Sequence, residues 1–374
     1  MSELRDPRMV SFERRPRISR FWVAFGLVAL VILLASTIPS PYAVERPGPV
    51  VDAFGTIETE AGDDVPVVSV EGAQTYPTSG ALNILSVSIS GTPERPVDWL
   101  TIAGALFDPT RSIVPVSSVF PEGMTSEERT KRNAAMMEAS QNAATVAALE
   151  ALERPVDVTL EVAEVVANGP AAGRLEVGDV ILRANGVEVA DLPELREVIG
   201  AVPQGDAVSL VIERDGDRRQ VSLTPTTASD GSRVIGISVR ESFTFDFDID
   251  LELDTIGGPS AGLIFTLAIY DVLTPGALTG GIDVSGTGTI DSAGRVGPIG
   301  GLTQKLWGAS RAGTSLMLMP LDNCADLPSR LPDGMSVVPV ATLDEALDAI
   351  EAAAAGRETA GVERCRVSAA QPHG

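Results

Sequence analysis

Residues 254–262 read DTIGGPSAG and join two stretches of different character. Before them, Phe, Ile and Leu occupy the odd positions from 243 to 253, and Thr, Asp and Glu occupy the even positions from 244 to 254. This period of two predicts one continuous strand with a buried face and an acidic, solvated face. After them, residues 261–273 are apolar nearly all round, which predicts a buried helix that Pro259 begins and Pro275 stops.

Ser260 is therefore expected where a strand turns through glycines into the start of a helix. The first N–H groups of a helix lack acceptors within it, and the helix dipole favours negative charge there. Such a turn suits a nucleophile with an oxyanion site beside it, so Ser260 is the candidate nucleophile. Gly258, Pro259 and Ala261 are expected to shape the turn and to support the oxyanion site.

The base that activates Ser260 has to be something other than histidine. The chain has one histidine, His373, near its end, which disfavours a Ser-His-Asp triad, Cys-His pairs and histidine-based zinc sites. We expect no metal and no cofactor. Lys131 and Lys305 are the only lysines, against 26 arginines (28 basic residues less two). A desolvated lysine can release its proton and an arginine cannot, so Lys305 is the candidate base; a chance surface lysine is the alternative.

Further motifs follow the serine turn. Residues 286–290 read GTGTI, and residues 294–302 read GRVGPIGGL ahead of Lys305, which lies 45 residues after Ser260 (305 − 260). Together with the GGPSAG turn, these motifs resemble those of Lon-type proteases. The resemblance implies an α+β proteolytic domain with a Ser260–Lys305 dyad. It also implies that Thr287, which matches a family threonine near the lysine, orients the amine; an ordinary strand hydroxyl is the alternative.

Residues 155–235 have a different pattern. They contain GPAAG at 169–173 and GDVIL at 178–182, then a helix capped by Asp191 and a hairpin around Asp215-Gly216. This segment resembles a bacterial PDZ domain, a fold that binds extended peptides as an added strand. The place expected for its carboxylate-binding loop reads Glu153-Arg154-Pro155 without glycine, which disfavours capture of a free C-terminus. A PDZ fold that serves only as a spacer is the alternative.

Taken together, the whole chain resembles the membrane-anchored, PDZ-containing Lon-like proteases of Gram-positive bacteria, with a match over most of residues 79–350. MEASQ at 137–141 looks like the first helix of the proteolytic domain, so the PDZ-like segment is an insertion. The expected parts are a stalk with entry strands (39–78), a first proteolytic part (79–154), the PDZ-like domain (155–235), a second proteolytic part (236–352) and a tail (353–374). The resemblance also implies a ring-shaped homo-oligomer.

Two helices carry readable caps. Thr125 and Glu128 form a capping box at the start of a helix over 125–152, on which we expect Glu138, Ser140 and Gln141 to be surface residues. Thr342 and Glu345 start a last helix that Gly356 ends.

Charge and composition exclude several function classes. The 374 residues carry a net charge of −23, and the first twenty residues hold six Arg and three acids, which leaves −26 on the remainder. Such a surface repels nucleic acid, and only 4% of residues are aromatic, too few for base-stacking platforms. Neither lysine follows a glycine, so no P-loop is encoded and we expect no dependence on ATP.

Residues 21–38 form an uncharged apolar stretch of 18 residues, long enough to span a bilayer as a helix. Arg14, Arg15, Arg17 and Arg20 precede it and only Arg46 follows closely, which predicts a cytoplasmic N-terminus (1–20) and an extracytoplasmic remainder. A cleaved signal peptide is the alternative, but Pro41-Tyr42-Ala43 is a poor cleavage site.

Cys324 and Cys365 are the only cysteines. Outside the cytoplasm such a pair favours one disulfide that ties down the tail, and two unpaired thiols are the alternative. The sequence as a whole predicts a single-pass membrane protein whose serine endopeptidase domain cleaves proteins or peptides outside the cytoplasm. The rival hypothesis is a non-catalytic scaffold whose PDZ and protease-like domains only bind peptides.

Overall fold

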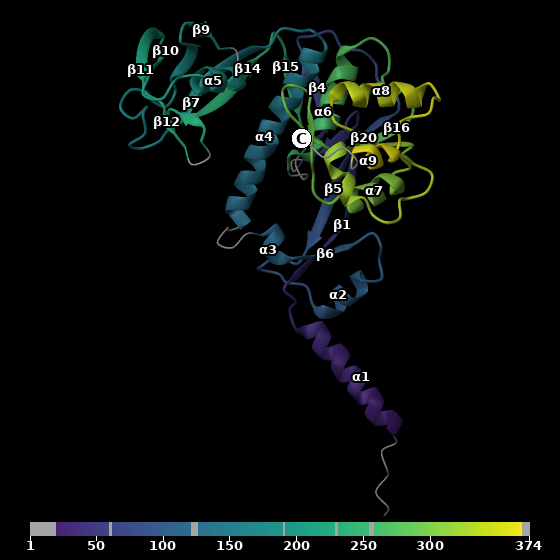
Figure 1. The fold of residues 1–374 in the computed structure, drawn as a ribbon. Coiled ribbons are helices and arrows are strands. Elements are labelled where there is room, and N and C mark those ends of the chain that lie inside the picture. Colours follow the sequence, from purple (N-terminus) through teal and green to yellow (C-terminus); the bar gives the residue numbers. More distant parts are fainter. Residues whose placement is uncertain are drawn as a thin grey trace, which may run out of the picture. The chain divides into compact units, whose positions relative to one another are not determined.

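The structure is a computed structural model that describes residues 20–59, 62–120, 126–189, 191–228, 231–253 and 258–368, and it is an α+β fold (Figure 1). It divides into two compact units. The first comprises Met1–Pro47 with Val87–Met124, and the second comprises Gly48–Ser86 with Thr125–Gly374. The division falls within two long strands, β1 (Tyr42–Asp52) and β5 (Ala81–Ser90).

The first unit begins with α1 (Arg20–Thr37), a helix with a mean hydropathy of 2.0 and no buried residue. Its length and composition fit the predicted membrane span. The chain continues through α2 (Trp99–Ala105), β6 (Ser112–Pro115) and α3 (Val116–Val119), and β6 pairs with the first residues of β1. Val44, Ile102 and Ala105 form the small core of this unit.

The first of two six-stranded sheets has the strand order β20-β19-β16-β5-β1-β6. Strands β16 (Asp283–Gly286), β19 (Leu316–Pro320) and β20 (Ser336–Val340) run parallel, and β16 also runs parallel to β5. All five residues of β19 are buried, as expected for an inner parallel strand covered on both faces.

Helices cover both faces of this sheet. On one face, α6 (Gly262–Leu273) and α8 (Leu343–Ala354) pack against Leu316 and Leu318 of β19. On the other face, α7 (Leu302–Arg311) packs against Met317 and Met319. Alternate residues of one strand thus meet different helices, which holds α6 and α7 on opposite sides of the sheet.

Residues 39–78 were expected to form a stalk with entry strands. The prediction of a stalk is wrong over most of this segment, which forms strands and packs into the core. Besides β1, the segment contributes β2 (Thr56–Glu58), β3 (Asp64–Pro66) and β4 (Val68–Glu71). Ala53 and Val67 are buried in the main core. The segment therefore contributes both strands and buried residues between them to the main core.

The predicted long helix is α4 (Ser126–Ala151), which packs on α6. Ala144 and Ala147 join the main core, and the Thr125 of the predicted capping box lies outside the described residues. The predicted cap of α8 is confirmed, because the Thr342 side chain accepts a hydrogen bond from the Glu345 N–H.

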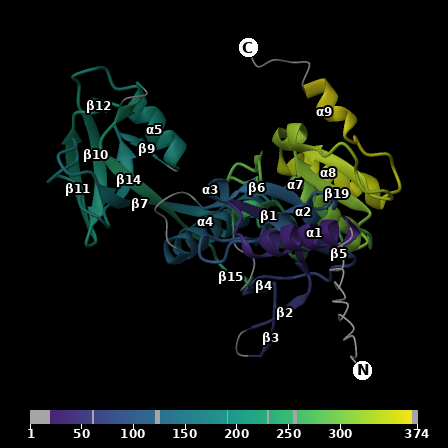
Figure 2. The same ribbon diagram turned by 90° about the horizontal axis from the view of Figure 1, so that it is seen from below.

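Residues 157–244 form the second sheet, with the strand order β11-β10-β8-β7-β14 and β9 paired with β8. The helix α5 (Leu192–Gly200) packs against this sheet, as Figures 1 and 2 show, and the Asp191 side chain caps it as predicted. The strands are β7 (Asp157–Val165), β8 (Val180–Ala184), β9 (Val187–Glu188), β10 (Val208–Arg214), β11 (Asp217–Leu223) and β14 (Ile237–Thr244), with a separate pair β12 (Thr226–Thr227) and β13 (Arg233–Val234).

The predicted continuous strand over 243–254 is in fact two strands. β14 pairs with β7 up to Thr244, and β15 (Asp248–Leu251) pairs with β4. The alternation of exposure continues through both, which is why the sequence reads as one strand. The predicted domain boundary after residue 235 is wrong for the same reason, since Ile235 and Ile237 pack in the core of the second sheet. Residues 254–257 lie outside the described part.

The tail is held to the main body. Cys324, in the 3-10 helix η2 (Leu321–Asp326), and Cys365, in α9 (Glu363–Ser368), are joined by a disulfide with a Cα–Cα distance of 5.3 Å. The Arg364 guanidinium also pairs with the Glu345 carboxylate of α8.

Candidate active site

Ser260 lies in a one-turn 3-10 helix, η1 (Pro259–Ala261), which runs directly into α6. Gly258, the residue before this 3-10 helix, has a φ of 108°, a backbone conformation that residues with side chains rarely adopt. Ser260 is half-buried. As predicted, the serine stands at the start of a helix whose first N–H groups have no intrahelical acceptor.

The segment that follows β16 fixes the serine turn. The Ser260 carbonyl accepts hydrogen bonds from the Gly288 N–H at 2.9 Å and from the Thr287 Oγ1 at 3.1 Å. The Leu263 N–H in turn donates to the Gly288 carbonyl at 3.2 Å. A Cβ on Gly288 would lie 2.7 Å from the Val296 side chain, so the close passage of the chain beside Val296 favours glycine at this position. The turn is therefore tied to the sheet by its backbone.

Lys305 belongs to α7, on the other face of the sheet. The helix starts after Gly301, which has a φ of 68°, and the Lys305 N–H donates to the Gly301 carbonyl at 3.1 Å. Its side chain is only 3% exposed, and this burial lowers the pKa of the amine from 10.5 to about 7. A large fraction of the amine is thus neutral near pH 7.

Thr287 connects the two candidate residues. The Lys305 Nζ donates to the Thr287 Oγ1 at 2.9 Å, and the same hydroxyl donates to the Ser260 carbonyl. The Thr287 side chain is fully buried, so this chain of hydrogen bonds is shielded from water. The structure thereby brings Ser260, Thr287 and Lys305 to one place from three separate elements.

Ser140 and Gln141 were expected on the surface of α4, and this expectation is wrong. The Ser140 hydroxyl is buried and donates to the Pro259 carbonyl at 3.0 Å, while the Gln141 amide donates to the Leu251 carbonyl at 2.7 Å. Both side chains support the backbone on either side of the serine turn. The MEASQ motif was the available signal, but helical spacing alone does not show which polar residues face a neighbouring backbone.

Asn323 holds the backbone of the segment that leads into α7. Its side-chain amide accepts from the Ile299 N–H and donates to the Ile299 carbonyl, both at 2.9 Å, and the residue is buried. Asn323 precedes Cys324 in η2, so the Cys324–Cys365 disulfide stabilises the 3-10 helix that carries these two hydrogen bonds. Nothing in the sequence pattern singled out Asn323, because its partner is a backbone 24 residues away.

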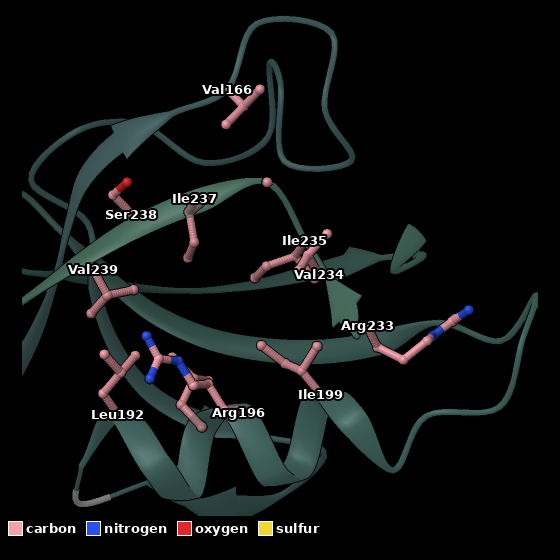
Figure 3. A pocket seen from close by; sticks show the side chains of 12 residues that line it. Val166, Leu192, Arg196, Ile199, Arg233, Val234, Ile235, Ile237, Ser238 and Val239 are labelled. Carbon is pink, nitrogen blue, oxygen red and sulfur yellow. The ribbon is translucent and has the colours of Figure 1, made fainter. Parts of the chain in front are cut away.

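A groove of about 530 Å³ lies between α5 and β14 in the second sheet (Figure 3). Leu195, Ile199 and Ile237 give it an apolar floor, and Arg196 points into it from α5. Its lining continues through Val234, Ile235 and Gly236. On its groove side, β14 is the edge strand of the sheet order, as strand addition by a peptide requires.

The groove favours a different place for the glycine-containing loop than residues 153–155. The strand that faces α5 is the last strand of the domain, not the first, and the residues before it include Gly236, with a φ of 77°. The argument from sequence against binding of a free C-terminus considered the residues before the first strand of the domain, whereas the groove lies beside the last strand.

Comparison with known proteins finds two domains, and the PDZ match has other bounds than the second sheet, since it includes part of α4 and ends before β14. Residues 255–352 match the Lon protease (S16) C-terminal proteolytic domain, and residues 137–224 match the PDZ domain. This chain carries a Lon-type proteolytic domain and a PDZ domain. The residues that match the Lon-type domain include Ser260, Thr287 and Lys305. The α5 side of the groove lies within the PDZ match, and its β14 side follows that match in the chain.

The curated relatives are Lon proteases. The chain is 43% identical to the Lon protease of Azospirillum brasilense over 93 residues, which are 24% of this chain and 11% of that protein. It is 39% identical to Lon protease 1 of Bacillus subtilis over 94 residues, 24% of this chain and 12% of that protein. The chain thus spans only about an eighth of the length of these relatives.

Solved structures match the PDZ domain. The PDZ domain of an SdrC-like protein from Listeria monocytogenes is 26% identical, with a TM-score of 0.21, over 21% of this chain and 85% of that one. The corresponding domain from Listeria innocua is 27% identical, with a TM-score of 0.21, over 22% and 92%. Among the residues that the structure describes, no group of three or more His, Cys, Asp or Glu side chains is placed to hold a metal ion.

Proposed function

We propose that this chain is a membrane-anchored, ATP-independent serine endopeptidase that acts outside the cytoplasm, with Ser260 as nucleophile and Lys305 as general base. The observation that carries the proposal is the buried Lys305 amine, which is hydrogen-bonded through Thr287 to the Ser260 turn. A pKa of about 7 lets this amine accept a proton at neutral pH, which an ordinary lysine does poorly.

The reaction would proceed in two halves. The neutral Lys305 amine takes the Ser260 proton as Oγ attacks the peptide carbonyl, and the resulting ammonium then protonates the leaving amine. The N–H groups of Ser260 and Ala261, at the start of the helix, would hold the oxyanion, with Gly258 and Pro259 shaping the turn. Water, activated by the same amine, then hydrolyses the acyl-enzyme. Thr287 would keep the amine oriented through both halves.

The anchor is α1, and the positive-inside rule puts the arginine-rich residues before it in the cytoplasm. The catalytic domain would then lie outside, where the Cys324–Cys365 disulfide is stable. We further propose that the proteolytic domain is discontinuous and that the PDZ domain, residues 157–244, is inserted into it. The groove beside β14 would hold part of a substrate as an extended strand.

A fluorophosphonate probe on the purified full-length chain tests the proposal. Wild type is expected to be labelled at Ser260, and Ser260→Ala not at all. Lys305→Arg keeps a positive charge but cannot act as a base, so its labelling rate should fall to less than a tenth. The double variant should lower the labelling rate little further than either single variant, because the two groups act as a unit.

A folded Lys305→Arg variant that retains more than about a tenth of the rate, a loss of less than roughly 1.4 kcal/mol, would show that Lys305 is not the base. A wild-type chain that stays unlabelled but binds peptides in its PDZ groove would instead favour the scaffold hypothesis.

A further inference from the structure

An uncharged apolar surface covers α2 and the two residues after it, residues 99–107, whose sequence is WLTIAGALF. Leu106 is 72% exposed and Phe107 is 89% exposed, while Trp99 and Leu100 are 40% and 48% exposed. Large apolar side chains that are contiguous and this exposed indicate a surface with a partner.

The segment is held in a defined conformation. Its opposite side buries Ile102 and Ala105 in the core of the first unit. The Asp98 side chain caps α2 by accepting from the Thr101 N–H at 2.7 Å, and Leu106 continues the helical backbone with φ −61° and ψ −24°. Leu100 and Phe107 are both exposed, so they lie away from the core that Ile102 and Ala105 join.

This surface begins beside the end of the apolar helix α1. Pro39 forms a β-bridge with Asp98, the Ser40 N–H donates to the Val97 carbonyl at 2.8 Å, and α1 packs against α2. An α-helix of 18 residues is about 27 Å long, close to the hydrocarbon thickness of a bilayer of about 30 Å. If α1 crosses the bilayer, its C-terminal end and the start of α2 therefore lie at the lipid headgroups.

Aromatic residues mark both ends of α1. Phe21 and Trp22 stand at its start, and the rings of Tyr42 and Trp99 form an edge-to-face pair, with centroids 6.0 Å apart, beyond its end. Tyr and Trp are enriched at both membrane interfaces, where the ring body meets lipid and the polar atom meets water.

We propose that residues 99–107 dock on the outer lipid surface as an interfacial element, with Leu100, Leu106 and Phe107 inserted among the acyl-chain ends. This inference rests on the proposed membrane anchor and adds a second attachment to it. A lipid surface is favoured over a protein partner because α1 places the bilayer boundary directly beside α2. The absence of charge between Asp98 and Asp108 suits insertion of the whole segment.

The test uses the full chain, reconstituted in phosphatidylcholine vesicles with and without lipids brominated near the headgroup. Trp22, Trp99 and Trp307 are the only tryptophans, so all three are changed to Phe and a single reporter is added by Phe107→Trp. Val177→Trp in the same background is the matched control, because Val177 is 67% exposed in the PDZ domain. A third protein, W22F/W307F, keeps the native Trp99 as an unperturbed reporter.

We expect brominated lipid to quench the F107W and Trp99 reporters at least twofold, and acrylamide in the water phase to quench them less than the V177W reporter. If brominated lipid does not quench the fluorescence of these reporters and acrylamide quenches it fully, the docking inference is overturned. Protection from acrylamide without quenching by brominated lipid, lost on dilution into more vesicles, would indicate contact with a second copy and also overturn it. A chain that fails to float with the vesicles would refute the anchor itself, and the docking surface with it.

Discussion

The reactivity of Ser260 should follow the protonation of one buried amine. Lys305 must be neutral to act as a base, and burial lowers its pKa to about 7. We therefore expect the rate of fluorophosphonate labelling to rise about tenfold per pH unit below pH 7 and to level off above it. Stopped-time labelling between pH 5 and 9 measures this. A rate that still rises steeply above pH 9 would indicate a lysine with an ordinary pKa.

Burial of the Lys305 amine also lowers the free energy of unfolding wherever the unfolded chain would hold the proton. The folded pKa lies below 10.5, so the unfolded chain binds a proton that the folded chain does not hold at pH values between about 7 and 10.5. Stability is therefore lost as the pH falls through this range and is constant below it. Moving a pKa from 10.5 to about 7 corresponds to at most roughly 5 kcal/mol.

Lys305→Met removes this penalty while filling a similar volume. We expect the variant to be inactive but more stable than wild type, with the largest gain below pH 7 and no gain above about pH 10.5. Urea unfolding at several pH values measures the difference. Lys131→Met is the control for the same substitution at an exposed lysine. A Lys305→Met variant that is less stable at pH 7 would mean that the Thr287 contact outweighs desolvation.

The sequence identified the candidate nucleophile and base from residue chemistry. Lys305, one of two lysines against 26 arginines, and a serine at a glycine turn are visible without a structure. The supports were not visible, because Ser140, Gln141 and Asn323 act through backbone carbonyls or N–H groups of distant segments. A hydrogen bond to a backbone leaves no pairing pattern in the sequence.

At the scale of elements, the contact between α4 and α6 positions the serine turn. Gly262 begins α6, and a Cβ there would lie 2.9 Å from the Ser140 Oγ and 3.2 Å from the Ile290 backbone nitrogen. Gly262→Ala should therefore displace the turn, slow labelling of Ser260 and cost about 1–3 kcal/mol of stability. Ser140→Ala added to it removes the nearest atom and should restore part of both.

Thermal unfolding and the labelling rate measure these effects. Gly200→Ala is the matched control, since nothing lies within 4 Å of its added Cβ, and we expect it to be neutral or slightly stabilising. If Gly262→Ala labels at the wild-type rate, the close approach of α4 does not set the position of Ser260.

Elements were predictable where one sheet or one helix face determined the pattern. The caps at Asp191 and Thr342 and the buried helix after Ser260 follow from local residues. The strand pattern over 243–254 misled because two different sheets bury the same alternating face. Periodicity reports that a face is buried and does not report what covers it.

At the scale of the whole molecule, strand pairing revises where the PDZ domain ends. Asp157 and Thr244 are register partners in the β7–β14 ladder, so the domain begins and ends with neighbouring residues. The Arg154 guanidinium lies 5.5 Å from the centre of the Phe247 ring, so the two connections also run close together. A short linker can therefore replace residues 157–244 without stretching the rest of the chain.

Removal of residues 157–244 separates chemistry from substrate delivery. With a short Gly/Ser linker in their place, labelling of Ser260 by a small probe should stay within about twofold of the full chain, because the Lys305–Thr287–Ser260 contacts lie outside the deleted segment. Cleavage of an unfolded protein such as casein should slow at least tenfold, because the β14 groove is lost. Arg196→Glu in the intact chain alters only the groove and should slow the cleavage of casein without affecting labelling. Unchanged casein cleavage by the folded deletion variant would reduce the PDZ domain to a spacer, and loss of labelling would show that it is a structural part of the proteolytic domain.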